Sequence, residues 1–370
     1  MNQNARQQRA NGRSEGTSVD GPPATVSAPE DTAHALARCE PATVLNDSST
    51  TVRSRVRAAA SGRGAGAAGR RRADGVDVNP RARRRRDLHR RSRGASSVTP
   101  PPVTPMHTQR VIPALGQQVR VDVRYGTGVP LVICNGIGAS LEVLDPLVEQ
   151  LNPDTPVVRF DVPGTGGSPN SPLPYGFPYL AAVLGRLLTK LGFAGRQVDI
   201  LGLSWGGALA QQFTFQNPRR CRRLILVSTG MGIGMVPAKP TVLAKMATPR
   251  RFVDHEYAAS VAAELYGGNA GTNAPEVKAL FARQSLSGSR VGYVHQLLAG
   301  SVWTSAVLLP LIRQRTLIIA GTNDPIIPVA NAHIMARLLP HATLHLHDGG
   351  HIDLVTNAGT LTPVIETFRQ

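Results

Sequence analysis

Residues 106–370 predict an α/β fold in which helices cover both faces of a mostly parallel sheet. Short apolar runs, of the kind found in strands buried on both faces, recur along this part of the chain. Amphipathic stretches of helical length lie between them. Because strand and helix alternate, successive strands need crossover connections, and these pack helices against both faces of the sheet.

The predicted strands begin with Gln118–Tyr125, where valines alternate with polar residues, so that one face of the strand should be buried. Five apolar runs and one alternating run follow as predicted strands: Leu131–Cys134, Val157–Phe160, Val198–Leu203, Leu224–Val227, Thr316–Ala320 and Thr343–His347. The predicted helices between them are about Tyr179–Leu191, Trp205–Gln216 and Val329–Leu338.

A long interval breaks this rhythm. About ninety residues separate the strand that ends near Val227 from the strand that begins at Thr316. An unstructured loop of that length is implausible in a compact domain, and helix-like pieces such as Tyr257–Leu265 and Val277–Ser285 lie within it. We therefore expect about 235–306 to form a mostly helical cap, inserted over the C-terminal edge of the sheet, where open α/β sheets bind ligands.

Residues 1–105 differ in composition from the rest of the chain. They hold 19 arginines, no lysine and 9 acidic residues, which gives a net charge of +10 out of +17 for the whole chain. With almost no aromatic residues, they cannot bury enough apolar surface to offset the entropy of ordering. We expect a disordered tail, or a segment upstream of the true translation start, since Met106 directly precedes the strand-like part. The alternative is a polyanion-binding arm.

Cysteine usage and hydropathy bear on the cellular setting. Cys39, Cys134 and Cys221 are far apart and have no metal-like spacing, as expected for free thiols in a reducing compartment. The first thirty residues lack the apolar segment of a secretory signal, and no run reaches the roughly 18 apolar residues of a membrane-spanning helix. We therefore expect a cytoplasmic protein without a transmembrane segment.

No cofactor or metal is expected either. The glycine-rich stretch 161–168 lacks the Lys-Ser/Thr pair of a phosphate loop and the spacing of a dinucleotide fingerprint, so we interpret it as a turn at the rim of a pocket. No metal-ligand spacing occurs in the domain. No specific nucleic-acid partner is expected, because no aromatic residues for base stacking accompany the arginines.

The candidate nucleophile is Ser204, at the centre of a Gly-x-Ser-x-Gly pattern with Gly202 and Gly206 at its ends. The pattern alone is weak evidence, and it occurs again around Ser14, where no strand precedes it. Ser204 follows the strand Val198–Leu203 and precedes a helix, which is the setting of a nucleophile elbow. At so tight a turn, side chains in place of the two glycines would collide with neighbouring backbone.

The candidate base and acid follow in the order Ser, Asp, His. His351 comes directly after the last predicted strand, at the edge of the sheet where Ser204 also emerges. Asp324 is the acidic residue in the loop after Thr316–Ala320. We predict that His351 acts as general base and that Asp324 orients its imidazole. The alternative for Asp324 is a cap on the helix that follows.

The oxyanion hole is predicted from backbone N–H groups at two places. One belongs to Trp205, directly after the nucleophile. The other belongs to Ile137, in the glycine-containing loop 135–138 that follows the strand Leu131–Cys134. Together with the triad order, these features are typical of the α/β-hydrolase fold.

Several stretches are also similar to one known family. They are 135–139, 160–164 and 204–213 in the core, 236–240, 248–252, 265–268 and 303–305 in the expected cap, and 324–328 and 348–351 around the triad. On these stretches residues 106–370 resemble the intracellular medium-chain-length poly(3-hydroxyalkanoate) depolymerases. The resemblance implies an α/β-hydrolase that cleaves the ester bonds of a storage polyester with the same three triad residues. Asn323, where an acidic residue is common, and the arginine-rich tail depart from the family pattern.

The resulting prediction is a serine hydrolase that depolymerises this polyester through an acyl-enzyme, in contact with the surface of a polymer granule. A set of apolar side chains is expected to receive the aliphatic chain: Leu297, Leu298, Trp303 and Val307. A generic carboxylesterase or lipase is the alternative within enzymes. A polyanion-binding or scaffold protein on a hydrolase fold is the alternative from another class. The sequence indicates no oligomeric state.

Overall fold

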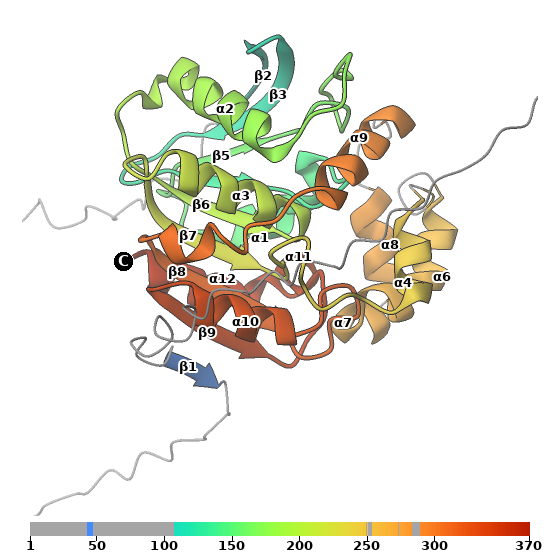
Figure 1. Cartoon of the computed structure of the whole chain (residues 1–370). Helices are drawn as coiled ribbons and strands as arrows, with labels where there is room; N and C mark the ends of the chain where they lie inside the picture. The colour runs from blue at the N-terminus through green and yellow to red at the C-terminus, as the bar shows by residue number, and fades with distance from the viewer. Residues whose placement is uncertain (1–42, 47–106, 249, 251–253, 273, 283–288) are drawn as a thin grey trace, which may run out of the picture. The chain divides into compact units, whose positions relative to one another are not determined.

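The computed structural model describes residues 43–46, 107–248, 250, 254–272, 274–282 and 289–370. Its centre is one sheet with the strand order β1-β9-β8-β7-β6-β4-β5-β3-β2, shown in Figure 1. The strands are β1 (Thr43–Asn46), β2 (His107–Ala114), β3 (Gln117–Arg124), β4 (Leu131–Cys134), β5 (Val157–Phe160), β6 (Val198–Leu203), β7 (Cys221–Val227), β8 (Arg315–Gly321) and β9 (Ala342–His347).

Strands β4 to β9 are parallel to one another, which confirms the predicted fold class. The hairpin of β2 and β3 closes one edge of the sheet, and β3 runs antiparallel to β5. At the other edge, β1 pairs in parallel with β9. Strand β1 lies within the stretch that was predicted to be disordered, where the sequence indicated no strand. The rest of that stretch lies outside the described residues, so its disorder stays a prediction.

Helices cover both faces of the sheet (Figure 1). They are α1 (Asp145–Gln150), α2 (Phe177–Leu188), α3 (Trp205–Gln216), α4 (Pro240–Met246), α6 (His255–Tyr266), α7 (Gly268–Thr272), α8 (Ala274–Ala282), α9 (Arg290–Ser301), α10 (Ala330–Leu338), α11 (Asp353–Thr356) and α12 (Ala358–Arg369). Short helical turns complete them: η1 (Leu141–Leu144), η2 (Thr189–Phe193) and η3 (Leu309–Leu311). Helices α2, α3 and α10 pack on one face, and α1 and α12 on the other.

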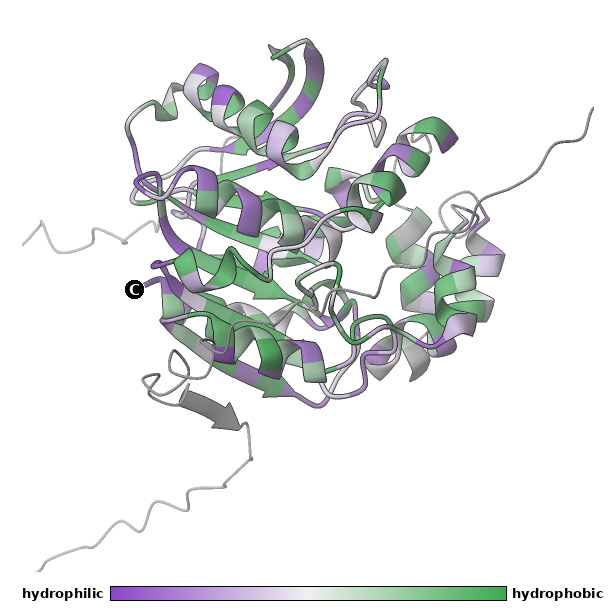
Figure 2. Cartoon of the chain, in the orientation of Figure 1, coloured by the Kyte–Doolittle hydropathy of each residue, from purple (hydrophilic) through white to green (hydrophobic). Residues whose placement is uncertain are grey.

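Two hydrophobic cores, one on each face, explain why the central strands are mostly apolar. In β4, Val132 and Cys134 pack into the core that contains Phe213 of α3. Their neighbours Leu131 and Ile133 point the other way, into the core of α1 and α12. Successive side chains of a strand alternate between faces, so a strand covered on both sides carries apolar residues at most of its positions. Figure 2 shows the central strands as mostly hydrophobic.

The predicted bounds of β4, β5, β6 and α3 agree with the structure. Helix α2 ends earlier than predicted, at Leu188 rather than Leu191. Beyond it the chain enters the π-type turn η2, where Gly192 has a φ of 88°. That left-handed conformation suits glycine and ends the regular helix.

The interval expected to form a cap is helical in its described part, with α4, α6, α7, α8 and α9 between β7 and β8. Helix α6 contacts α4, α7 and α8. Val261 and Leu265 of α6 and Val277 and Leu280 of α8 are buried and join the core on the α1 face. These helices therefore share a core with the sheet, and they gather at one end of it in Figure 1.

Candidate active site

Ser204 occupies a strained turn between β6 and α3. Its φ of 54° and ψ of −120° lie in a region that residues with side chains rarely adopt. A β-carbon at Gly202 would lie 2.5 Å from the carbonyl oxygen of Gly206, and one at Gly206 would lie 2.1 Å from that of Cys134. Both positions therefore need glycine for the steric reason that the sequence suggested.

The structure brings Ser204, His351 and Asp324 into one hydrogen-bonded chain. The Nε2 atom of His351 lies 2.9 Å from Oγ of Ser204, and Nδ1 lies 2.8 Å from Oδ2 of Asp324. His351 and Asp324 are buried, with 4% and 7% of their surfaces exposed. With its proton on Nδ1, the imidazole donates to the carboxylate and leaves Nε2 as the acceptor for the serine hydroxyl.

Asp324 does not cap the next helix, which was the alternative for this residue. Helix α10 begins at Ala330 and has Val329 at its N-cap position. The Oδ1 atom of Asp324 instead accepts hydrogen bonds of 2.9 Å from the backbone N–H groups of Ile326 and Ile327. These bonds fix the carboxylate in the tight turn after β8, with its other oxygen directed to the imidazole.

The two predicted oxyanion donors lie beside Ser204, Ile137 on the loop after β4 and Trp205 at the first position of α3. A β-carbon on Gly136 would come within 3.8 Å of Cβ of Ser204, so the loop after β4 passes directly by the nucleophile. Among the described residues, the backbone N–H groups of Ile137 and Trp205 find no hydrogen-bond acceptor. Both residues line the cleft at Ser204. Their N–H groups are therefore available for an oxyanion.

The loop that carries Ile137 is held by its own asparagine and by the cap. Asn135 accepts a hydrogen bond from the N–H of Gly136 and donates one to the carbonyl oxygen of Ser140. On the cap side, Oε1 of Gln296 accepts a hydrogen bond of 3.0 Å from the N–H of Gly138. Gln296 belongs to α9 and is completely buried. Sequence reasoning missed it, because a glutamine within a cap helix carries no signal for a contact with a distant loop.

The indole of Trp205 is tied to the same helix. Its Nε1–H donates a hydrogen bond of 2.9 Å to the carbonyl oxygen of Gln296, and its ring lies 4.6 Å from that of Phe177 between centroids. The residue directly after the nucleophile and the oxyanion loop are thus both attached to one residue of α9.

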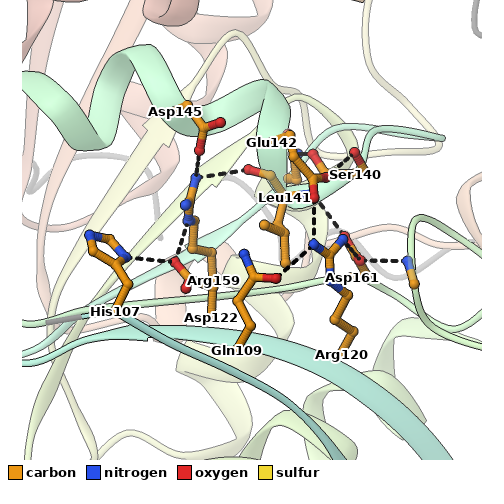
Figure 3. A network of polar contacts seen from close by, with 12 residues as sticks. His107, Gln109, Arg120, Asp122, Ser140, Leu141, Glu142, Asp145, Arg159 and Asp161 are labelled. Atoms are coloured by element: carbon orange, nitrogen blue, oxygen red, sulfur yellow. Dashed lines mark hydrogen bonds and ion pairs between the residues drawn. The ribbon is translucent and has the colours of Figure 1, made fainter. Parts of the chain in front are cut away.

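A network of charged residues holds the turn η1, which follows the oxyanion loop in the chain (Figure 3). Asp161 accepts hydrogen bonds of 2.8 Å from the N–H groups of Leu141 and Gly167 and one of 3.2 Å from Arg120. Arg120 also pairs with Glu142 over 2.5 Å. Burial raises the pKa of Asp161 to about 6, against the opposing effect of these hydrogen bonds. The sequence of the stretch 161–168 suggested a turn at the rim of a pocket. That interpretation was wrong for Asp161, which is fully buried.

The cleft at Ser204 has two lobes. The lobe that contains the imidazole, here called the histidine-side lobe, is lined by Asn135, Gly136, Ile137, Ala139, Val143, Leu203, Ser204, Met246, Tyr266, Leu280, Ile326, His351, Ile352 and Val355. The lobe beyond the indole, here called the tryptophan-side lobe, is lined by Ile137, Phe177, Ser204, Trp205, Ala208, Thr229, Gly230, Gly232, Met235, Met246, Gly300, Trp303, Ile326 and Ile327. They enclose about 470 and 620 Å³ of space, part of it open to solvent, and both linings are mostly apolar.

The four residues expected to receive an aliphatic chain are placed differently by the structure. Trp303 lines the tryptophan-side lobe. Leu298 and Val307 are 46% and 74% exposed and line neither lobe, and Leu297 packs against the core instead. The apolar lining comes mainly from Met235, Met246, Leu280 and residues at strand ends, so the prediction was wrong for three of the four.

Cys134 and Cys221 are free and buried, and burial raises the pKa of the Cys221 thiol to about 12. Cys39 and the second Gly-x-Ser-x-Gly pattern around Ser14 lie outside the described residues. Within the described ranges, no cluster of three or more His, Cys, Asp or Glu side chains is placed to hold a metal ion. In the same part of the chain, none of the helices has the length and apolar character needed to cross a membrane.

Comparison with known proteins identifies the class. A family model described as alpha/beta hydrolase fold matches residues 129–358, and the chain belongs to this family. The more particular likeness is to the poly(3-hydroxyalkanoate) depolymerase of Ectopseudomonas oleovorans, which is 44% identical over 263 residues, covering 70% of this chain and 92% of that protein. The resemblance seen in the sequence is thereby confirmed, and the chain is a homologue of that hydrolase.

Solved structures agree on the fold. The enol-lactonase from Burkholderia xenovorans LB400 aligns with a TM-score of 0.61 at 23% identity, over 70% of this chain and 99% of that one. A thermophilic esterase from Thermogutta terrifontis aligns with a TM-score of 0.58 at 24% identity, over 70% and 97% of the two chains. At these identities the likeness supports the fold alone.

Proposed function

We propose that this protein hydrolyses the ester bonds of an intracellular medium-chain-length poly(3-hydroxyalkanoate), with Ser204 as nucleophile, His351 as general base and Asp324 as the residue that orients the imidazole. The observation that carries the proposal is the hydrogen-bonded chain of these three side chains at the junction of two apolar lobes. The polyester is taken from the homologue with 44% identity over most of its length.

In the first half of the reaction, Oγ of Ser204 attacks the ester carbonyl carbon while Nε2 of His351 takes the hydroxyl proton. The N–H groups of Ile137 and Trp205 stabilise the negative charge on the carbonyl oxygen. When the tetrahedral intermediate collapses, the bond to the alkoxy oxygen breaks. The alcohol leaves with the proton from Nε2, and the acyl group stays bound to Ser204.

In the second half, water takes the place of the alcohol. His351 accepts a proton from the water as its oxygen attacks the acyl carbon, and the same two N–H groups hold the oxyanion. Collapse breaks the bond to Oγ and returns the proton to Ser204. Asp324 stabilises the imidazolium in both halves, because its carboxylate already accepts the Nδ1–H.

The position of the imidazole indicates which part of the substrate each lobe receives. The departing oxygen must reach Nε2 of His351, and His351 lines only the histidine-side lobe. The alcohol part of the substrate then extends into that lobe, and the acyl part, bound to Ser204, extends into the tryptophan-side lobe. A polyester chain continues on both sides of every ester bond, so it can fill both lobes with aliphatic groups.

This function places the protein in the cytoplasm at the surface of a polymer granule, because the substrate is insoluble in water. The apolar lining of both lobes is suited to short aliphatic side chains. A generic carboxylesterase acting on small soluble esters would use the same triad. The test therefore has to separate the two substrates.

The test uses the full-length chain, as wild type and as Ser204→Ala, on a medium-chain p-nitrophenyl ester and on a suspension of medium-chain poly(3-hydroxyalkanoate). Wild type should hydrolyse both, and Ser204→Ala should lower both turnovers by about four to six powers of ten. Cleavage of the soluble ester alone would replace the depolymerase by a generic carboxylesterase. Full activity of Ser204→Ala would show that the nucleophile is another residue.

A further inference from the structure

Helix α9 carries an apolar stripe on its solvent side. Val291, Val294 and Leu298 are 52%, 49% and 46% exposed, and Val302, just beyond the helix, is 75% exposed. Their spacing of three, four and four residues places them along one face of the helix. Solvent-facing positions of a helix normally carry polar residues. Four large apolar side chains in a row at such positions therefore mark a surface that contacts something.

The opposite face of α9 is fastened to the active site. Tyr293, Gln296 and Ala299 are buried there. Gln296 holds the N–H of Gly138 in the oxyanion loop and the indole of Trp205, and Gly300 lines the tryptophan-side lobe. The same helix therefore carries the exposed stripe on one side and a wall of the cleft on the other.

A further exposed apolar residue lies beside the end of α9. Ile233, which is 57% exposed, is held beside the end of α9 by a hydrogen bond of 2.9 Å from its N–H to the carbonyl oxygen of Trp303. Met235, two residues on, lines the tryptophan-side lobe. We call Val291, Val294, Leu298, Val302 and Ile233 the α9 stripe.

We propose that the α9 stripe is the surface by which this protein docks on solid aliphatic polyester. The inference rests on the proposed function, since it assigns a surface to the same substrate. Docking through α9 would bring the wall of the tryptophan-side lobe next to the polymer, so that only a short length of chain has to leave the solid to reach Ser204.

The charge of α9 favours this partner. Arg290, at its first position, is the single lysine, arginine, aspartate or glutamate in the helix. An aliphatic polyester presents alkyl groups and ester oxygens and carries no charge, so it cannot form an ion pair with the surface of the protein. A stripe without charges can be buried against it without the cost of desolvating unpaired ions.

The experiment measures adsorption and hydrolysis separately, with the full-length chain. The test protein is the double variant Val294→Gln/Leu298→Gln, because glutamine keeps helix propensity and both side chains point to solvent. The control is Leu311→Gln. Leu311 is 58% exposed but precedes β8, at the end of the parallel sheet opposite to Ser204.

Adsorption is measured by sedimentation with medium-chain poly(3-hydroxyalkanoate) particles, with every variant combined with Ser204→Ala so that the polymer is not consumed. The double variant should adsorb about tenfold more weakly than its parent, and Leu311→Gln should adsorb equally. With Ser204 restored, the double variant should lose polymer hydrolysis in the same proportion and keep its turnover of a soluble p-nitrophenyl ester.

Equal adsorption of the double variant and its parent would overturn the inference, whether or not the polymer is hydrolysed. A parent protein that is a dimer in solution and becomes a monomer in the double variant would also overturn it, because the stripe would then be a contact between copies. A wild type that adsorbs through the stripe but cleaves only soluble esters would contradict the proposed function and leave the docking surface supported.

Discussion

The backbone N–H of His351 donates a hydrogen bond of 2.7 Å to the carbonyl oxygen of Tyr266, the last residue of α6. The cap thus holds the loop that carries the imidazole. The packing there leaves no room for a side chain, since a β-carbon on Gly350 would lie 2.2 Å from the same carbonyl oxygen. Gly267 packs equally closely on the backbone of Asn323, next to Asp324. One turn of the cap therefore sets the positions of His351 and of the loop that carries Asp324, its orienting carboxylate.

Gly350→Ala should displace either His351 or the end of α6. A misplacement of about 1 Å in a catalytic group can cost roughly a hundredfold in rate, so we expect turnover of a soluble ester to fall by that order, together with a lower melting temperature. Gly359→Ala is the control, because no atom lies within 4 Å of the added carbon in α12. Unchanged turnover in Gly350→Ala would show that the contact with Tyr266 does not position the imidazole.

The strain at Ser204 gives a prediction about stability. Ser204→Gly should be more stable than Ser204→Ala by about 1 kcal/mol, because glycine adopts a φ of 54° without a clash of its β-carbon. Ser260, an exposed residue within α6, is the control, and there glycine should be less stable than alanine by about 1 kcal/mol. Urea unfolding of the four inactive or surface variants measures both differences. If alanine is more stable than glycine at both sites, the result would argue against backbone strain at the nucleophile.

The strands and the triad could be predicted because their signals are local. Strand β4 is apolar throughout, and β5 and β6 are apolar apart from Arg159 and Asp199, since each strand is covered on both faces. Ser204 and His351 each follow a strand at the same edge of the sheet, so chain order alone places them together. The elbow adds Gly202 and Gly206 as a further local signal. A β-carbon at either position would lie 2.1 to 2.5 Å from a neighbouring backbone oxygen, which explains why both are glycine.

The contacts between cap and site could not be predicted, because no regular spacing links them. Gln296 and Gly138 are 158 positions apart, and their hydrogen bond depends on how α9 packs over the loop. The burial of Asp161 depends likewise on Arg120 and on the backbone N–H groups of Leu141 and Gly167. The position of Leu298 on the exposed side of α9 follows from the same packing. Pairing within the sheet decides which sides of a strand are buried. A cap helix has no such pairing, so which of its sides is buried depends on how it packs.

Asp324→Asn should lower turnover by about four powers of ten and leave the fold intact. The amide oxygen can still accept from Ile326 and Ile327, but its NH₂ group cannot accept the Nδ1–H of His351, so the imidazole adopts the wrong tautomer. Asp348→Asn is the control, because Asp348 is exposed and pairs with Asn323. Steady-state kinetics on a soluble ester test this assignment. A larger loss in Asp348→Asn than in Asp324→Asn would exchange the roles of the two carboxylates.

Gln296→Met tests the attachment of the oxyanion loop to α9. Methionine keeps the volume of the side chain and removes the oxygen that accepts from Gly138. We expect kcat to fall by about tenfold to a hundredfold, less than the loss of an oxyanion donor itself, while KM for a soluble ester changes little. Gln197→Met, on the surface, should leave both constants unchanged. An equal rise in KM with kcat preserved would assign Gln296 to ground-state binding instead.

Acid should destabilise the protein through His347, a buried residue of β9. Burial lowers the pKa of His347 below 6.5, against the opposing charges of Asp353, Asp324 and Asp348 and with a smaller lowering effect of His345. The unfolded state then binds a proton more readily than the folded state, so this contribution to stability is complete above about pH 6.5 and is lost as pH falls below it. Urea unfolding between pH 5 and pH 7.5 should show a smaller loss for His347→Gln than for wild type. Parallel curves for the two proteins would mean that His347 titrates alike in the folded and unfolded states.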